Sequence, residues 1–111
     1  MNIVDDFLAS AARFVEIRRD IHAHPELGFE EHRTADKVAG LLAEWGIEVH
    51  RGIAGTGVVG VLRKGTGART IGLRADMDAL PLEEANAFAH RSTHAGRMHA
   101  CGHDGHTTML L

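Results

Sequence analysis

Apolar residues return at helical spacing in the first part of the chain. Between residues 5 and about 22 they recur every three or four positions, and charged residues fill the opposite side. The apolar members are Phe7, Leu8, Ala11, Phe14, Val15 and Ile21. This periodicity is typical of an amphipathic helix. We therefore expect a first helix here, with Arg18 and Arg19 on its solvated face.

A second helical pattern covers residues 30 to about 45. Its apolar stripe consists of Ala35, Val38, Leu41, Leu42 and Trp45. Pro25 and Gly28 interrupt a helical path before it, and Gly46 stands where a helix commonly ends in a left-handed residue. The pattern predicts two helices joined by the connection "HAHPELGFEE", to which we assign a structural role only.

The period changes in the middle of the chain. Residues 47–52 alternate, and residues 58–64 and 69–74 read as two strands joined by a short turn that contains glycine. The nearly continuous apolar run from Val58 to Leu62 is typical of a sheet covered on both faces. The sequence therefore predicts a hairpin of 58–64 with 69–74 inside an α/β domain.

The last third of the chain carries weaker signals. Residues 76–99 read as loop, with a weak helical tendency at 82–87, and residues 103–111 read as the first turns of a helix. That last pattern shows no capping glycine and no polar exit. We expect the sequence to be the front part of a longer protein. Association of the fragment through its exposed strand edge, favoured by Met109, Leu110 and Leu111, is an alternative that stays open.

The segment "GTGVVG", residues 55–60, matches the glycine pattern of dinucleotide-binding folds. In those folds the glycines lead from a strand into a helix whose N-terminus meets the pyrophosphate. Here another turn follows four residues after Gly60. We therefore interpret these glycines as strand-entry and bulge positions and expect no dinucleotide site.

Composition narrows the class of protein. The chain has 111 residues, which is the length of one domain, and a net charge of −3 with both signs spread along it. It therefore lacks the basic footprint of a nucleic-acid partner. No apolar stretch is long enough to span a bilayer. A single cysteine and an acidic N-terminus without a secretory signal favour a cytoplasmic protein.

The densest chemistry lies in "MHACGHDGH", residues 98–106. Thiolate and imidazole suit zinc, and Cys101 and His103 can present both from one loop. Gly102 and Gly105 allow a tight backbone around such an ion. Three alternatives stay open: Cys101 as a small buried apolar residue, Cys101 as a nucleophile, and His99 and His106 as helix-capping or solvent-facing side chains.

A second polar cluster is "RADMDALP", residues 74–81. Asp76 and Asp78 are two positions apart, so in an extended segment they point the same way while Met77 points the other way. Two close carboxylates repel unless a cation or a histidine lies between them. The alternative is an Asx turn before Pro81. We expect the scattered histidines to be surface or structural residues: His22, His24, His32, His50, His90 and His94.

Three segments, "RRDIHAHPELGFEEHRTA", "GLRADMDALP" and "MHACGHDGHTTMLL", closely resemble the N-terminal part of the M20 metallopeptidase family, in its amidohydrolase branch. The branch includes hippurate hydrolases and N-acyl-amino-acid deacylases. The resemblance implies an α/β catalytic domain with a mixed sheet, of which residues 1–111 form the N-terminal part, and a lid and dimerisation domain outside this sequence. The segment before "MHACGHD" lacks the family's usual proline.

The resemblance also implies site residues. Cys101 and His103 correspond to metal ligands, and Asp78 to an aspartate that orients a ligand. Asp76 stands where other branches have a ligating histidine, so we treat it as an accessory residue. The implied cofactors are two divalent ions, Zn, Mn, Co or Ni. The adjacent glutamate pair and a late histidine of the family correspond to positions beyond residue 111.

The implied activity is metal-dependent hydrolysis of the amide bond in N-acyl amino acids or small peptide-like substrates, by a homo-oligomer. We expect this chain alone to be inactive because it lacks the glutamate pair. The alternative is a truncated, non-catalytic protein that binds metal or a partner. The two differ in whether the reading frame continues past Leu111.

Overall fold

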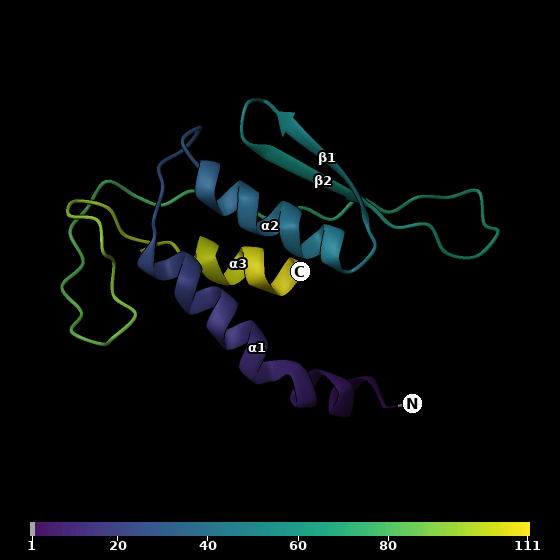
Figure 1. Cartoon of the computed structure of the whole chain (residues 1–111), viewed down its shortest axis with the longest axis horizontal. Helices are drawn as coiled ribbons and strands as arrows, with labels where there is room; N and C mark the ends of the chain where they lie inside the picture. The colour runs from purple at the N-terminus through teal and green to yellow at the C-terminus, as the bar shows by residue number, and fades with distance from the viewer. Residues whose placement is uncertain (1) are drawn as a thin grey trace.

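The computed structural model describes residues 2–111, which form three helices and one antiparallel hairpin (Figure 1). The elements follow one another along the chain as α1 (Ile3–Ala23), α2 (His32–Glu44), β1 (Glu48–Ile53), β2 (Gly57–Val61) and α3 (His103–Leu110). The α2 helix packs against both strands, and α3 packs against α1. These contacts confirm a mixed α/β arrangement, with the long loop of residues 62–102 between the hairpin and α3.

Local signals account for the two predicted helices. The side chain of Asn2 accepts a hydrogen bond from the backbone N–H of Val4, 3.1 Å away, at the start of α1, and acidic residues occupy the first turn. The helix ends before Pro25, because the residue preceding a proline disfavours helical geometry. After α2, Gly46 adopts φ +75° and its N–H bonds to the carbonyl of Ala43, as the expected cap.

The predicted hairpin of 58–64 with 69–74 is wrong. The alternating segment at 47–52 forms β1, and β1 pairs with β2. The turn lies at Ala54 and Gly55, which both have positive φ, and such residues match the twist of a tight hairpin. Residues 69–74 form no strand among the described residues, and Ile71 is 85% exposed.

Some of the other expectations for the middle of the chain are confirmed and others are wrong. No helix follows Gly60, so the dinucleotide pattern has the wrong setting, as expected. A Cβ on Gly57 would lie 2.5 Å from the carbonyl oxygen of Ile53, so strand entry requires glycine there. The bulge lies in β1 between Arg51 and Ile53. Coverage of both sheet faces is wrong for residues 2–111, since Val59 is half exposed. Residues 82–87 form no helix.

The buried interior of residues 2–111 holds more polar side chains than apolar ones. The apolar core consists of Ile17, Ile21, Ala35, Val38, Ala39 and Ala79. The buried polar and charged residues are His22, Glu31, Thr34, Thr56, Glu84, His99, Asp104, Thr107 and Thr108. A buried polar group needs a hydrogen-bond partner, so pairings between these residues decide how the segments fit together.

The N-terminal half of α1 extends away from the other elements (Figure 1). Phe7 and Leu8, which belong to its predicted apolar stripe, are exposed, and burial begins at Ile17. Arg18 and Arg19 lie on the exposed side, as expected. None of the helices in residues 2–111 combines the length and the apolar character needed to cross a membrane.

Candidate metal centre

An extended segment carries the two aspartates past the beginning of α3. Its place is fixed at both sides: the N–H of Ala79 bonds to the carbonyl of Glu26, and the N–H of Leu80 bonds to the carbonyl of Met98. Asp76 and Asp78 both reach the side of α3, while Met77 lines a separate cavity together with residues of β2. The structure therefore confirms that the two carboxylates share one side and that a histidine lies between them.

His103 is the first residue of α3, and its ring is held between the two carboxylates. Nδ1 lies 2.9 Å from Oδ1 of Asp78, and Nε2 lies 3.4 Å from Oδ2 of Asp76. The side chain is 14% exposed. When Nδ1–H donates to Asp78, the lone pair of Nε2 is left facing Asp76. A carboxylate that fixes a histidine in this way is the usual support of a metal-binding imidazole.

His106 lies one helical turn after His103, on the same face of α3. Its Nδ1 is 2.7 Å from Oδ1 of Asp76, and the two imidazole rings stack with their centroids 5.3 Å apart. The hydroxyl of Thr107 donates to the carbonyl of Asp76 at 2.8 Å, which ties the extended segment to the helix. Asp76, His103 and His106 thus offer three ligand atoms within 4.8 Å of one another.

The donor set fits a divalent transition metal, because two imidazoles and a carboxylate are ligands that Zn²⁺ and its neighbours accept. The hydrogen bond from His106 lowers the pKa of Asp76, against burial, which raises it, and the nearby His103 acts in the same direction as His106. Asp76 therefore stays ionised at neutral pH. An ionised carboxylate beside a free imidazole nitrogen is what a cation needs.

Cys101 lies outside this group of three. The residue is exposed, and one residue, Gly102, separates it from α3. Gly102 has a left-handed backbone conformation with φ +82°. The structure thus brings His103 together with Asp76 and Asp78, and it does not bring the Cys101 thiol among their ligand atoms. Cys101 as a metal ligand stays a prediction from the resemblance.

Sequence reasoning left His106 undecided between helix capping and solvent. The available signal is the spacing in "HDGH", since residues three apart share a helical face once the helix begins at His103. The buried residues beside the site, His22, Glu84 and Asp104, carried no such signal.

His22 lies between the carboxylates of Glu84 and Asp104 in the interior. It lies near the end of α1, its Nδ1 is 2.9 Å from Oδ2 of Asp104, and its Nε2 is 2.9 Å from Oε2 of Glu84. Both carboxylate side chains are almost fully buried. Burial by itself raises the pKa of Glu84, but hydrogen bonds from Asn86, from His22 and from the backbone N–H of Ser92 outweigh it and lower the pKa to about 2.

This depressed pKa predicts acid sensitivity. Glu84 titrates near 4.5 when exposed and near 2 in the fold. Its contribution to the free energy of unfolding is therefore fully present above about pH 4.5 and is lost as the pH falls toward 2. We expect the urea midpoint to drop across this range, and to drop less steeply in Glu84→Gln, when both are followed by circular dichroism. Equal slopes for the two proteins would contradict the assignment.

Comparisons with known proteins show what this chain resembles. The sequence profile described as Peptidase family M20/M25/M40 matches residues 72–111, which include both aspartates and α3. The YXEP protein of Bacillus subtilis, described as a dinuclear metal binding peptidase from the M20 family, superposes with a TM-score of 0.85 at 40% identity. The match covers 90% of this chain and 28% of that one.

Two curated relatives are similar to this chain over most or all of its length. Hippurate hydrolase of Campylobacter jejuni is 54% identical over 111 residues, all of this chain and 29% of the relative. N-acyl-L-amino acid amidohydrolase of Geobacillus stearothermophilus is 50% identical over 95 residues, 85% of this chain and 25% of the relative. The chain spans less than a third of the length of either relative. Residues 72–111 thus match the model of the peptidase family M20/M25/M40, and the chain as a whole resembles one part of each of these longer relatives.

Proposed function

We propose that this chain supplies metal-binding residues of a metal-dependent hydrolase that cleaves the amide bond of N-acyl amino acids or small peptide-like substrates. The names of the relatives support this substrate class, since hippurate is an N-acyl amino acid. One observation in the structure carries the proposal: Asp78 holds Nδ1 of His103, which leaves Nε2 facing a second carboxylate.

His103 is the ligand on which geometry and resemblance agree. Asp76 and His106 complete a three-donor group in the structure, and the resemblance adds Cys101. Asp78 acts on His103 as an orienting residue. A bound divalent ion, Zn, Mn, Co or Ni, would polarise the scissile carbonyl and acidify water at this site. Residues 76–106 would thereby hold one part of a centre of two ions.

The remaining catalytic groups belong to the proposal as well. By resemblance, the glutamate pair and the late histidine correspond to positions beyond residue 111, and so does a lid and dimerisation domain. We therefore expect residues 1–111 to bind metal without hydrolysing substrate. For the complete hydrolase we propose a cytoplasmic homo-oligomer acting on small molecules.

Zinc titration and a hydrolysis assay together test the proposal. The 111-residue chain, freed of metal, is titrated with Zn²⁺ and with Mn²⁺ by calorimetry, and release of glycine from hippurate is followed in the same samples. We expect one equivalent of metal and no glycine. No metal binding by the wild-type chain would reject the site. Hydrolysis of hippurate by this chain would reject the proposal that catalysis needs groups beyond residue 111.

The support that Asp78 gives to His103 leads to a quantitative prediction. Asp78→Asn keeps the shape of the side chain and removes its charge, so the hydrogen bond to Nδ1 weakens while the ligand atoms remain. We expect the zinc affinity to fall roughly 10- to 100-fold, the usual effect of removing a partner of a ligating histidine. Glu48→Gln on the distant β1 is the matched control. An unchanged affinity in Asp78→Asn would show that Asp78 does not orient the ligand.

A further inference from the structure

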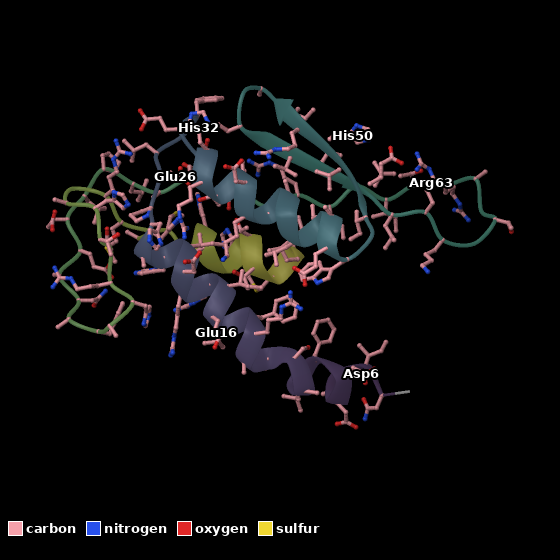
Figure 2. All side chains as sticks on the ribbon, in the orientation of Figure 1. Asp6, Glu16, Glu26, His32, His50 and Arg63 are labelled. Carbon is pink, nitrogen blue, oxygen red and sulfur yellow. The ribbon has the colours of Figure 1, made fainter. Side chains whose placement is uncertain are left out.

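His22 connects three segments that are far apart along the chain. It comes from the last turn of α1, Asp104 from the first turn of α3, and Glu84 from the loop before α3. The contacts span 82 and 62 residues of sequence. Figure 2 shows side chains gathered where the end of α1 and the start of α3 meet. His22 is 6% exposed, so water does not compete for its ring nitrogens.

The two carboxylates depend on His22 to different degrees. Glu84 also accepts hydrogen bonds from Asn86 and from the backbone of Ser92. The carboxylate of Asp104 has no hydrogen-bond partner other than His22 among residues 2–111, although it is 3% exposed. A buried carboxylate without a partner is costly, so the position of Asp104 follows the position of His22.

The start of α3 lacks its own fixing group. Gly102 is the N-cap residue, and it has no side chain to receive the free N–H groups of the first turn. The first turn is held from the side instead, through Asp104 and His22. His103 is the residue immediately before Asp104, so whatever holds Asp104 also sets the direction in which the His103 ring leaves the helix.

We propose that His22 is a positioning residue of the metal centre: by binding Asp104 with one ring nitrogen and Glu84 with the other, it fixes the first turn of α3 and thereby aims His103 at its metal. The inference rests on the proposed function, since it assumes that His103 binds metal. His22 itself does not join the ligands. Its role is distinct from that of Asp78, which touches the His103 ring directly.

The test uses His22→Gln in the 111-residue chain. The amide keeps a polar side chain but lacks two opposed ring nitrogens, so it can hold only one of the two carboxylates. We expect a folded protein by circular dichroism with a zinc dissociation constant roughly 10- to 100-fold higher. We also expect changed ¹⁵N chemical shifts of the His103 ring in long-range ¹H–¹⁵N spectra recorded without metal.

Two control variants separate positioning from general loss of stability. His50→Gln changes an exposed histidine on β1 and should leave the zinc dissociation constant and the His103 shifts unchanged. Val38→Ala removes methyl groups from a buried residue of α2 that takes no part in the hydrogen bonds of His22 or His103, and it should lower the urea midpoint without altering either quantity. If Val38→Ala weakens zinc binding as much as His22→Gln does, the inference is overturned.

The outcomes distinguish this inference from the proposed function. A folded His22→Gln protein with wild-type zinc affinity and unmoved His103 shifts overturns the inference and leaves the metal site standing. If the wild-type chain binds no zinc, the proposed site fails, and the His103 shifts alone then decide: a change in His22→Gln but not in His50→Gln supports positioning, and no change overturns it.

A second variant covers the case in which His22→Gln does not fold. Glu84→Gln keeps an acceptor oxygen beside His22 and removes one charge. It should move the His103 shifts in the same direction by a smaller amount. Unchanged His103 shifts in a folded Glu84→Gln protein would overturn the inference.

Discussion

Replacing His22 with phenylalanine is expected to remove a large part of the chain's free energy of unfolding. The ring shape is kept, but the carboxylates of Asp104 and Glu84 lose the donor between them while they remain buried. A buried hydrogen-bonding group that is left without its partner costs about 1 to 3 kcal/mol, and more when that group is charged. A domain of this size has a total free energy of unfolding of only about 5 to 15 kcal/mol. Urea denaturation followed by circular dichroism measures the loss.

His99→Phe is the matched comparison. His99 is 4% exposed, and its ring lies 6.4 Å from that of His22, yet neither of its ring nitrogens has a hydrogen-bond partner in residues 2–111. Burial lowers the pKa of His99, so its ring is neutral at pH 7. Removing an unpaired buried polar group should lower the free energy of unfolding by about 1 kcal/mol at most, and it can also raise it. Equal losses in the two variants would contradict the assignment of His22.

His103→Ala is expected to abolish metal binding. His103 is the one ligand shared by the geometric group and the resemblance, and no neighbouring imidazole occupies its place between Asp76 and Asp78. Loss of a first ligand from a site with few donors should weaken zinc binding by ~100-fold or more. Calorimetric titration of the apo protein checks this, with circular dichroism to show that α3 remains folded.

The same titration identifies the other ligands. If Asp76 and His106 bind the ion, His106→Ala weakens zinc binding strongly and Cys101→Ser does not. If the resemblance is right, the order is reversed, and Co²⁺ bound to the wild-type chain shows a thiolate charge-transfer band that Cys101→Ser removes. Wild-type affinity in His103→Ala would reject both sets.

Helices could be predicted from the sequence because their signals are local. The apolar spacing, the capping side chain of Asn2 and the position of Pro25 all lie within a few residues of the helix ends that they determine. The hairpin failed because pairing is not local: two glycine-containing turns were available, and the prediction took the one near Gly65. The positive φ of Ala54, which marks the real turn, has no signature in the residue type.

The same distinction between local and non-local signals applies to the candidate site. Alternation along a strand placed Asp76 and Asp78 on one side, and the structure confirms it. The prediction that His22 is a surface or structural residue was right in its second part, but its partners lie 82 and 62 residues away, where no periodicity reaches. His106 lies beside His103 only because α3 begins at His103. The residues of "MHACGHDGH" do not by themselves determine where that helix begins.

The span of the His22–Asp104 contact has a consequence for how the protein folds. Because it closes a loop of 82 residues, this contact requires the end of α1 to meet the start of α3, and loop closure of that length is entropically costly. Contacts of such high sequence separation slow folding. We expect the His22–Asp104 contact to form after α2 and the hairpin, so that stopped-flow refolding shows helix signal before zinc capture. A ribosome-bound chain would then acquire its metal only once α3 has left the exit tunnel.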